Sequence, residues 1–190
     1  MRNTFDRFNG RHQDYQAARP SYAQEFLDWL GELYAPPERY TAADIGSGTG
    51  KLSAQLLAAG FRVCGVEPNP DMRGAAEALL GGDPRFSSSN GTDHDTGLPD
   101  RSVDMVAAAQ AFHWFDGPAF ARECRRILRP GGRAVLVWNV RGSAPMNQAL
   151  AQVFREHCPS FHGFTGGMGE DDPRIRDFFF HHLAHPERGF

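Results

Sequence analysis

The chain has 190 residues, 41% of them hydrophobic, and a net charge of −3, which suits one globular domain with a substantial core. The negative balance offers no general attraction for a nucleic-acid backbone, and no run of about 18 apolar residues predicts a membrane span. The three cysteines are far apart in the sequence and do not suggest a disulfide framework. The N-terminal residues do not have the pattern of a secretory signal peptide. We therefore expect a cytoplasmic monomer or homodimer without nucleic-acid or membrane partners.

The first segment of the chain, residues 1–38, predicts lid helices that cover a sheet. Its apolar residues recur at helical spacing and end before Pro36-Pro37. The face consists of Tyr22, Phe26, Trp29, Leu30 and Leu33. We expect a single domain in which residues 39–140 form the core sheet and residues 141–190 form a helical insertion and tail.

The segment Thr41–Leu52 predicts a short buried strand, a turn with three glycines, and a helix. Gly46, Gly48 and Gly50 permit positive φ and let a ligand approach more closely than a Cβ would allow. The helix that follows offers unpaired N–H groups and its positive end. The spacing is one residue short of a P-loop, and the third glycine comes one residue early for a dehydrogenase fingerprint. The turn predicts a nucleotide-like ligand at the end of the first strand.

A second strand is expected over residues 61–66, and it is followed directly by an acidic residue. Glu67 stands 21 residues after Gly46, where βαβ folds place the acid that accepts hydrogen bonds from a ribose diol. The alternative is an ordinary exposed turn acid. A helix over residues 69–80 carries Met72, which either contacts the ligand or packs in the core.

A weak third strand over residues 85–90 and a loop lead to a fourth strand over residues 102–109. That strand runs straight into Gln110-Ala111-Phe112-His113-Trp114-Phe115-Asp116. Ligands of α/β sheets bind at the carboxyl ends of strands, so we expect Gln110, Phe112, His113 and Trp114 to line a pocket. His113 is either a base or a hydrogen-bonded structural histidine.

The last regular elements are a helix that begins after Asp116, the segment Leu128-Arg129-Pro130-Gly131-Gly132, and a fifth strand over residues 133–140. In this segment proline ends the helix and the glycines form a turn. An amphipathic helix is expected over residues 145–157. No metal site is expected, because the three C-terminal histidines lack a suitably spaced acidic or cysteine partner.

Two motifs carry a family resemblance. Asp44-Ile45-Gly46-Ser47-Gly48-Thr49-Gly50 resembles the D-x-G-x-G-x-G motif of class I S-adenosylmethionine (SAM) methyltransferases, and Leu128–Gly132 resembles their L-[KR]-P-G-G motif. Glu67 and the segment from Leu98 to Val106 agree with the family in order and spacing, so the resemblance covers residues 40–140. Beyond it, the chain looks like a small-molecule methyltransferase of the "methyltransferase 11" type.

The resemblance implies an α/β fold with a Rossmann-like, doubly wound sheet. Class I methyltransferases normally have seven strands, of which the last two form an antiparallel hairpin. Five strands are evident in this sequence, so we expect the C-terminal hairpin to be missing or truncated.

The resemblance also implies a site for SAM, with S-adenosylhomocysteine as product and a small molecule as methyl acceptor. Asp93 or His94 would accept a hydrogen bond from the adenine amino group, and Tyr15 and Arg19 would fold over the cofactor. The expected cofactor-binding residues are Asp44, Gly46, Ser47, Gly48, Gly50, Glu67, Pro68, Met72, Asp93, His94, Gln110, Tyr15 and Arg19. The acceptor pocket is expected at Phe112, His113 and Trp114, with His113 as the base for a hydroxyl or amine acceptor.

Two other functions compete with this interpretation. An NAD-dependent oxidoreductase suits Glu67 but not Asp44 or the Leu128–Gly132 motif. A SAM-fold protein that binds without catalysis is favoured if the hairpin is missing. Methylation of bases is disfavoured, because Ala109-Gln110-Ala111-Phe112 stands where the N/D-P-P-Y/W tetrapeptide would be.

Overall fold

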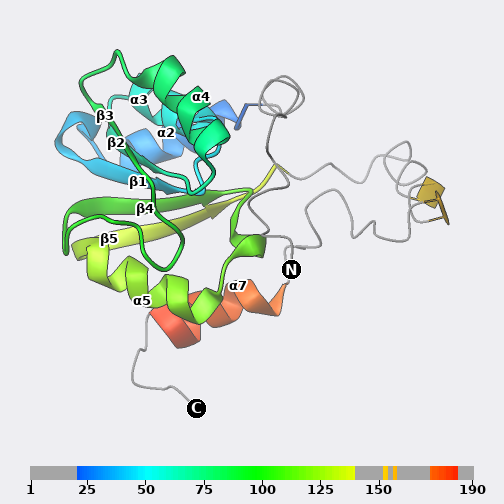
Figure 1. The fold of residues 1–190 in the computed structure, drawn as a ribbon. Helices are drawn as coiled ribbons and strands as arrows, with labels where there is room; N and C mark the ends of the chain where they lie inside the picture. Colours follow the sequence, from blue (N-terminus) through cyan, green and yellow to red (C-terminus); the bar gives the residue numbers. More distant parts are fainter. Residues whose placement is uncertain (1–20, 140–151, 154–155, 158–171, 184–190) are drawn as a thin grey trace.

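Five parallel strands form the centre of the molecule (Figure 1). The computed structural model describes residues 21–139, 152–153, 156–157 and 172–183. The strands are β1 (Thr41–Ile45), β2 (Arg62–Val66), β3 (Phe86–Ser89), β4 (Val103–Ala109) and β5 (Leu128–Val137). They are ordered β3-β2-β1-β4-β5, and each neighbouring pair is parallel. The order reverses between β1 and β4, and such a switch point opens a ligand crevice at the carboxyl ends of the strands.

Helices cover both faces of the sheet, which confirms the doubly wound α/β fold. Figure 1 shows α2, α3 and α4 on one side and α5 and α7 on the other. The α-helices are α2 (Gln24–Leu33), α3 (Lys51–Ala58), α4 (Pro70–Leu80), α5 (Gly117–Ile127) and α7 (Pro173–Asp177). Shorter turns are η2 (Pro37–Arg39) and η3 (Phe112–Trp114), and a π-helical segment, η4 (Phe178–Leu183), follows α7.

Alternation along the strands divides the apolar side chains between two cores. One core joins Leu30 of α2 and Leu56 of α3 to Val63 and Met105 of the sheet. The other core contains, among its buried side chains, Ile45, Val106, Phe112, Phe120, Ile127 and Phe178. Side chains of β1 and β4 belong to both cores, so both strands are packed on both faces up to the ends where a site can form.

Two local expectations were wrong. The expected apolar face of the first helix included Trp29, but the α2 helix leaves Trp29 49% exposed and buries Leu27 instead. Strand β5 begins at Leu128 rather than at residue 133, because Leu128 already pairs with Val103. The register then shifts before Met105 pairs with Arg133, so the glycines of the Leu128–Gly132 motif form a bulge within the strand rather than a turn before it.

Several expectations lie outside the described residues. Tyr15 and Arg19 belong to residues 1–20, and most of the helix expected over residues 145–157 is also outside. The described part contains no antiparallel strand pair. The domain limits at residues 38 and 140 and the missing hairpin therefore stay predictions.

Candidate functional site

A cavity of about 210 Å³ lies at the carboxyl ends of β1, β2 and β4. Residues of the glycine turn, of the β2 end, of the loop after β3 and of the segment after β4 meet there. Its wall consists of Tyr22, Asp44, Gly46, Ser47, Gly48, Thr49, Lys51, Leu52, Glu67, Pro68, Met72, Gly91, Thr92, Asp93, Ala109, Gln110, Ala111, Trp114 and Phe115. The cavity thus occupies the switch point of the sheet.

The three glycines of the turn all have positive φ, at +70°, +57° and +80°, but they serve different neighbours. A Cβ on Gly46 would lie 2.8 Å from the Cβ of Ala111, and a Cβ on Gly50 would lie 2.9 Å from Cδ1 of Leu80. No atom lies within 4 Å of a Cβ placed on Gly48. Two glycines therefore allow protein segments to pack closely, whereas the middle one leaves room for a ligand.

Asp44 is a buried carboxylate at the end of β1. Its Oδ2 accepts a hydrogen bond of 2.7 Å from Ser53 Oγ, while its buried Oδ1 has no hydrogen-bond partner among the described residues. Burial raises the pKa of Asp44 to about 6, and the nearby charge of Glu67 acts in the same direction, although the Ser53 hydrogen bond opposes both. A ligand that brings a hydrogen-bond donor or a positive charge would complete this site.

Glu67 directly follows β2 and is also buried. Its Oε2 accepts a hydrogen bond of 2.9 Å from the Gly48 amide, and its Oε1 accepts one of 2.8 Å from the Asn69 amide. Burial raises the pKa of Glu67, although both amides oppose the shift. Each oxygen keeps a further lone pair, so the carboxylate can hold the turn and still accept a bond from a ligand hydroxyl.

The segment after β4 separates its aromatic side chains. Trp114 lines the cavity and is 49% exposed, and the ring of His113 lies against it with a centroid distance of 4.8 Å. Phe112, expected in the pocket, is instead buried in the core, where its ring centroid lies 5.1 Å from that of Phe178. His113 was also expected to line the pocket but is not among the residues of the wall. The η3 turn (Phe112–Trp114) accounts for this difference, because consecutive side chains of such a turn point in different directions: Phe112 into the core and Trp114 toward the cavity.

Gln110 begins this segment with a positive φ of 57°, which is rare for a residue other than glycine. Its amide donates to the carbonyl of Val137 at 2.8 Å, and its Nε2 donates to the carbonyl of Asn139 at 3.3 Å. Such strained conformations gather at functional sites. Gln110 lines the cavity, as expected.

The loop after β3 places its two candidate residues, Asp93 and His94, differently. Asp93 lines the cavity, and its Oδ2 accepts a hydrogen bond of 3.1 Å from the Asp116 amide. His94 is not part of the wall, and 59% of its side chain is exposed. Of the two residues, the structure brings Asp93 to the site.

Sequence reasoning missed several residues of the wall. Thr49, Lys51, Leu52, Thr92 and Phe115 lie within two positions of predicted site residues, so proximity in the sequence could have identified them. Tyr22 comes from the residues before α2, and its amide donates to Gln55 Oε1 at 3.0 Å. That contact spans 33 residues and leaves no local pattern in the sequence.

Two further kinds of site were sought in the structure. Across the described ranges, no three histidine, cysteine, aspartate or glutamate side chains gather as metal ligands. None of the helices in the described part of the chain is both long and apolar enough to cross a membrane.

Comparison with known families decides the identity of this fold. Residues 43–136 match the family model described as a methyltransferase domain. The chain belongs to the methyltransferase family and has its class I, Rossmann-like fold. The matched range includes both motifs and every strand of this methyltransferase from β2 to β4, as well as most of β1 and β5.

Related proteins carry the same description. An uncharacterised methyltransferase of Mycobacterium tuberculosis is 42% identical over 127 residues, which are 67% of this chain and 49% of the relative. An uncharacterised methyltransferase of Schizosaccharomyces pombe is 31% identical over 147 residues, covering 76% of this chain and 57% of the relative. The chain spans about half the length of the curated relatives that it matches.

Solved structures show the same fold. A candidate type II methyltransferase from Anaeromyxobacter dehalogenans is 37% identical, with a TM-score of 0.59 over 76% of this chain and 57% of that chain. A candidate methyltransferase from an antibiotic biosynthesis pathway of Anabaena variabilis is 26% identical, with a TM-score of 0.58 over 74% and 56% of the two chains. The methyltransferase sheet is therefore shared with both.

Proposed function

We propose that this chain binds SAM in the cavity at the β1–β4 switch point and transfers its methyl group to a small-molecule acceptor. The observation that carries the proposal is that Asp44 and Glu67, which lie at the ends of neighbouring strands, line one common cavity with the open face of Gly48. The unpartnered Oδ1 of Asp44 and the space over Gly48 suit a ligand with a cationic part and a flat part.

The residues of the wall divide the binding task by their chemistry. Asp44 would accept hydrogen bonds from the amino-acid end of SAM, Glu67 would accept them from the ribose hydroxyls, and Asp93 would accept one from the adenine amino group. The glycine turn precedes α3, and the N-terminal amides of that helix add positive potential. Pro68 and Met72 supply apolar surface on the same wall.

Catalysis then depends mainly on orientation and on the exclusion of water. SAM supplies a methyl group already activated by a positively charged sulfonium. The chain holds donor and acceptor in line, and such alignment can contribute up to about 7–11 kcal/mol of the barrier. Trp114 and Phe115 form the aromatic part of the wall and are our candidates for contacts with the acceptor.

A base is required only for some acceptors. A carboxylate or thiolate acceptor needs none, whereas a hydroxyl or amine must lose a proton, and His113 is our candidate to take it. His113 lies against Trp114 rather than in the wall, so a role as base requires access past the Trp114 indole. Replacement of His113 by alanine should then lower turnover and leave SAM affinity unchanged. Unchanged turnover would make the histidine structural.

The small-molecule acceptor has separate support. The Anabaena variabilis protein of similar fold is described as belonging to an antibiotic biosynthesis pathway, and the net charge of this chain does not favour nucleic acid. The cytoplasmic location and the monomeric or homodimeric state stay predictions.

The test combines binding with turnover. Calorimetric titration of the full chain with S-adenosylhomocysteine and with NAD should give binding to the first and none to the second. Transfer of labelled methyl from SAM to a panel of small acids, phenols and amines then separates an enzyme from a binding protein. Binding of NAD alone would overturn the proposal, and binding of S-adenosylhomocysteine without transfer to any acceptor would leave only the SAM-binding part of it.

A further inference from the structure

The loop that brings Asp93 to the cavity folds back on itself. The loop begins at Gly91 and ends at Thr96, and these two residues are so close that a Cβ on Gly91 would lie 2.4 Å from the carbonyl oxygen of Thr96. Across the loop, the Thr92 amide donates to the Asp95 carbonyl at 2.8 Å, and the Asp95 amide donates to Thr92 Oγ1 at 3.2 Å. The loop is thus a closed unit whose position is set where its two ends meet.

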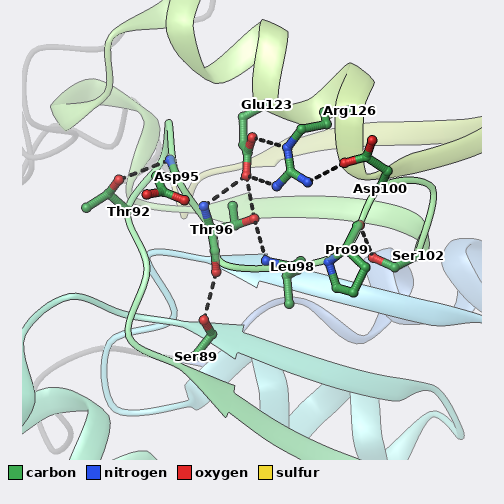
Figure 2. Close-up of polar contacts among 10 residues, drawn as sticks. All are labelled: Ser89, Thr92, Asp95, Thr96, Leu98, Pro99, Asp100, Ser102, Glu123 and Arg126. Atoms are coloured by element: carbon green, nitrogen blue, oxygen red, sulfur yellow. Dashed lines mark hydrogen bonds and ion pairs between the residues drawn. The ribbon is translucent and has the colours of Figure 1, made fainter.

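Thr96 fixes that point to two separate elements (Figure 2). Its amide and its Oγ1 both donate to Glu123 Oε1, at 2.9 Å and 2.5 Å, and its carbonyl accepts from Ser89 Oγ at 2.7 Å. Thr96 is fully buried, Ser89 ends β3, and Glu123 belongs to α5. One side chain and its peptide groups therefore connect the loop to the sheet and to the helix.

Glu123 is held as a buried carboxylate. Arg126, one turn later on α5, donates from Nε to Oε2 at 2.8 Å and from Nη2 to Oε1 at 2.6 Å. The Arg126 Nη1 donates outward to Asp100 at 2.7 Å. Although burial alone would raise it, the pKa of Glu123 lies below its usual range, because Arg126 and Thr96 both donate to the carboxylate. Hydrogen bonds to a charged acceptor are the stronger kind.

The cavity face of the same loop consists of Gly91, Thr92 and Asp93. Beyond the loop, Asp93 is held by the Asp116 amide, and that contact is exposed. The buried bonds of Thr96 to Glu123, together with its part-buried bond from Ser89, therefore give the loop its firmest attachment. Neither Thr96 nor Glu123 lines the cavity.

We propose that Thr96 and Glu123 are positioning residues that hold the Asp93 carboxylate where it distinguishes an adenine base from a base without an amino group. This inference rests on the proposed SAM site. Thr96 and Glu123 would thus contribute to ligand specificity although neither residue lines the cavity.

The test compares two ligands on the same protein, namely S-adenosylhomocysteine and its inosine analogue, in which a carbonyl replaces the adenine amino group. The wild-type chain should prefer the adenine ligand, because a carboxylate accepts from an amino group and repels a carbonyl oxygen. Replacement Thr96→Val keeps the volume and removes the hydroxyl, and should reduce that preference by about tenfold. Because the preference is a ratio, a smaller folded fraction changes both affinities equally and cancels.

Two control variants limit the interpretation. Thr96→Ser keeps the hydroxyl and should restore the preference. The Asp100 side chain, the outer partner of Arg126, is 76% exposed, so Asp100→Asn removes only its charge and should leave the preference unchanged. Hydrogen exchange without ligand should be faster at the amides of residues 92–95 in Thr96→Val and unchanged in α5.

The outcomes separate the two proposals. An unchanged preference in Thr96→Val, with the wild-type chain binding S-adenosylhomocysteine, overturns the positioning role alone. A wild-type chain that binds neither ligand overturns the proposed function and, with it, this inference. Loss of preference in Thr96→Val with rescue in Thr96→Ser supports the positioning role.

Discussion

The carboxylate of Glu67 accepts a hydrogen bond of 2.9 Å from the amide of Gly48, which joins the end of β2 to the glycine turn after β1. The same side chain accepts from the Asn69 amide, so one buried acid fixes two turns of the cavity wall. A ligand bound there meets a turn whose shape is already set, and preorganisation of this kind lowers the cost of binding.

The first prediction concerns this acid. In Glu67→Gln an NH₂ group replaces one of the two carboxylate oxygens. The backbone amide of Gly48 or of Asn69 then loses its acceptor and is left as an unpaired donor. We expect a loss of about 1–3 kcal/mol in the free energy of unfolding, with at least tenfold weaker binding of S-adenosylhomocysteine. Urea unfolding and calorimetry measure the two effects.

Glu77→Gln is the matched control for Glu67→Gln. Glu77 is a half-exposed acid on α4 that pairs with Arg73 at 3.7 Å, and such pairs contribute only about 0.3–0.5 kcal/mol. Equal effects of the two substitutions on ligand binding would contradict the assigned role of Glu67.

The second prediction compares two glycines that leave equal space. Neither Gly48 nor Gly74 has an atom within 4 Å of an added Cβ, but Gly48 lines the cavity with positive φ and Gly74 lies within α4. Gly48→Ala should abolish detectable binding of S-adenosylhomocysteine and cost about 1–2 kcal/mol of stability through backbone strain. Gly74→Ala should leave binding intact and stabilise the fold by about 0.5–1 kcal/mol. Binding by Gly48→Ala at wild-type affinity would place the ligand elsewhere.

The third prediction follows from the raised pKa of Asp44, which is about 6 in the folded chain against an ordinary value of 3.8. The folded state holds the proton more tightly than the unfolded state does, so this group favours folding most below its ordinary pKa. The contribution is lost as pH rises through about 6. Between pH 5 and pH 7.5 the loss should be about 1.4 kcal/mol.

The measurement is urea unfolding of wild type and Asp44→Asn at both pH values, since the variant lacks this titration. The difference in unfolding free energy between the two proteins should shift by the amount given. Binding of S-adenosylhomocysteine should move the opposite way, tightening in wild type as Asp44 ionises, because the cationic end of the ligand favours the carboxylate. Parallel pH profiles for the two proteins would exclude Asp44 as the titrating group.

Periodicity and motifs were sufficient to predict the sheet. Alternating or continuous apolar runs marked β1, β2 and β4, and the glycine turn placed α3 after β1, because these signals are local. The spacing of Glu67 after Gly46 also predicted that two strand ends would meet at one cavity, and the structure brings them together. The confirmed family explains why order and spacing agreed.

The remaining features depend on tertiary packing, which a single sequence does not display. The pattern of glycines did not show that Gly46 faces Ala111 and Gly50 faces Leu80, because those contacts come from distant segments. The η3 turn buries Phe112 and leaves Trp114 at the cavity, and the link between Thr96 and Glu123 spans 27 residues. Such contacts decide which residues of a correctly predicted segment reach the cavity.

The last prediction uses the two aromatic side chains that the η3 turn separates. Phe112 is buried among Phe120, Trp138 and Phe178, so Phe112→Ala should cost about 3–5 kcal/mol of stability through lost burial and a cavity. Trp114 is half-exposed at the wall of the ligand cavity, so Trp114→Ala should cost less than about 1 kcal/mol. Once an acceptor has been identified, Trp114→Ala should raise its KM severalfold and leave the affinity for S-adenosylhomocysteine within twofold, as initial rates and calorimetry will show. If Phe112→Ala is as stable as wild type, Phe112 does not have the core role that its burial indicates. If Trp114→Ala leaves the acceptor KM unchanged, Trp114 does not contact the acceptor.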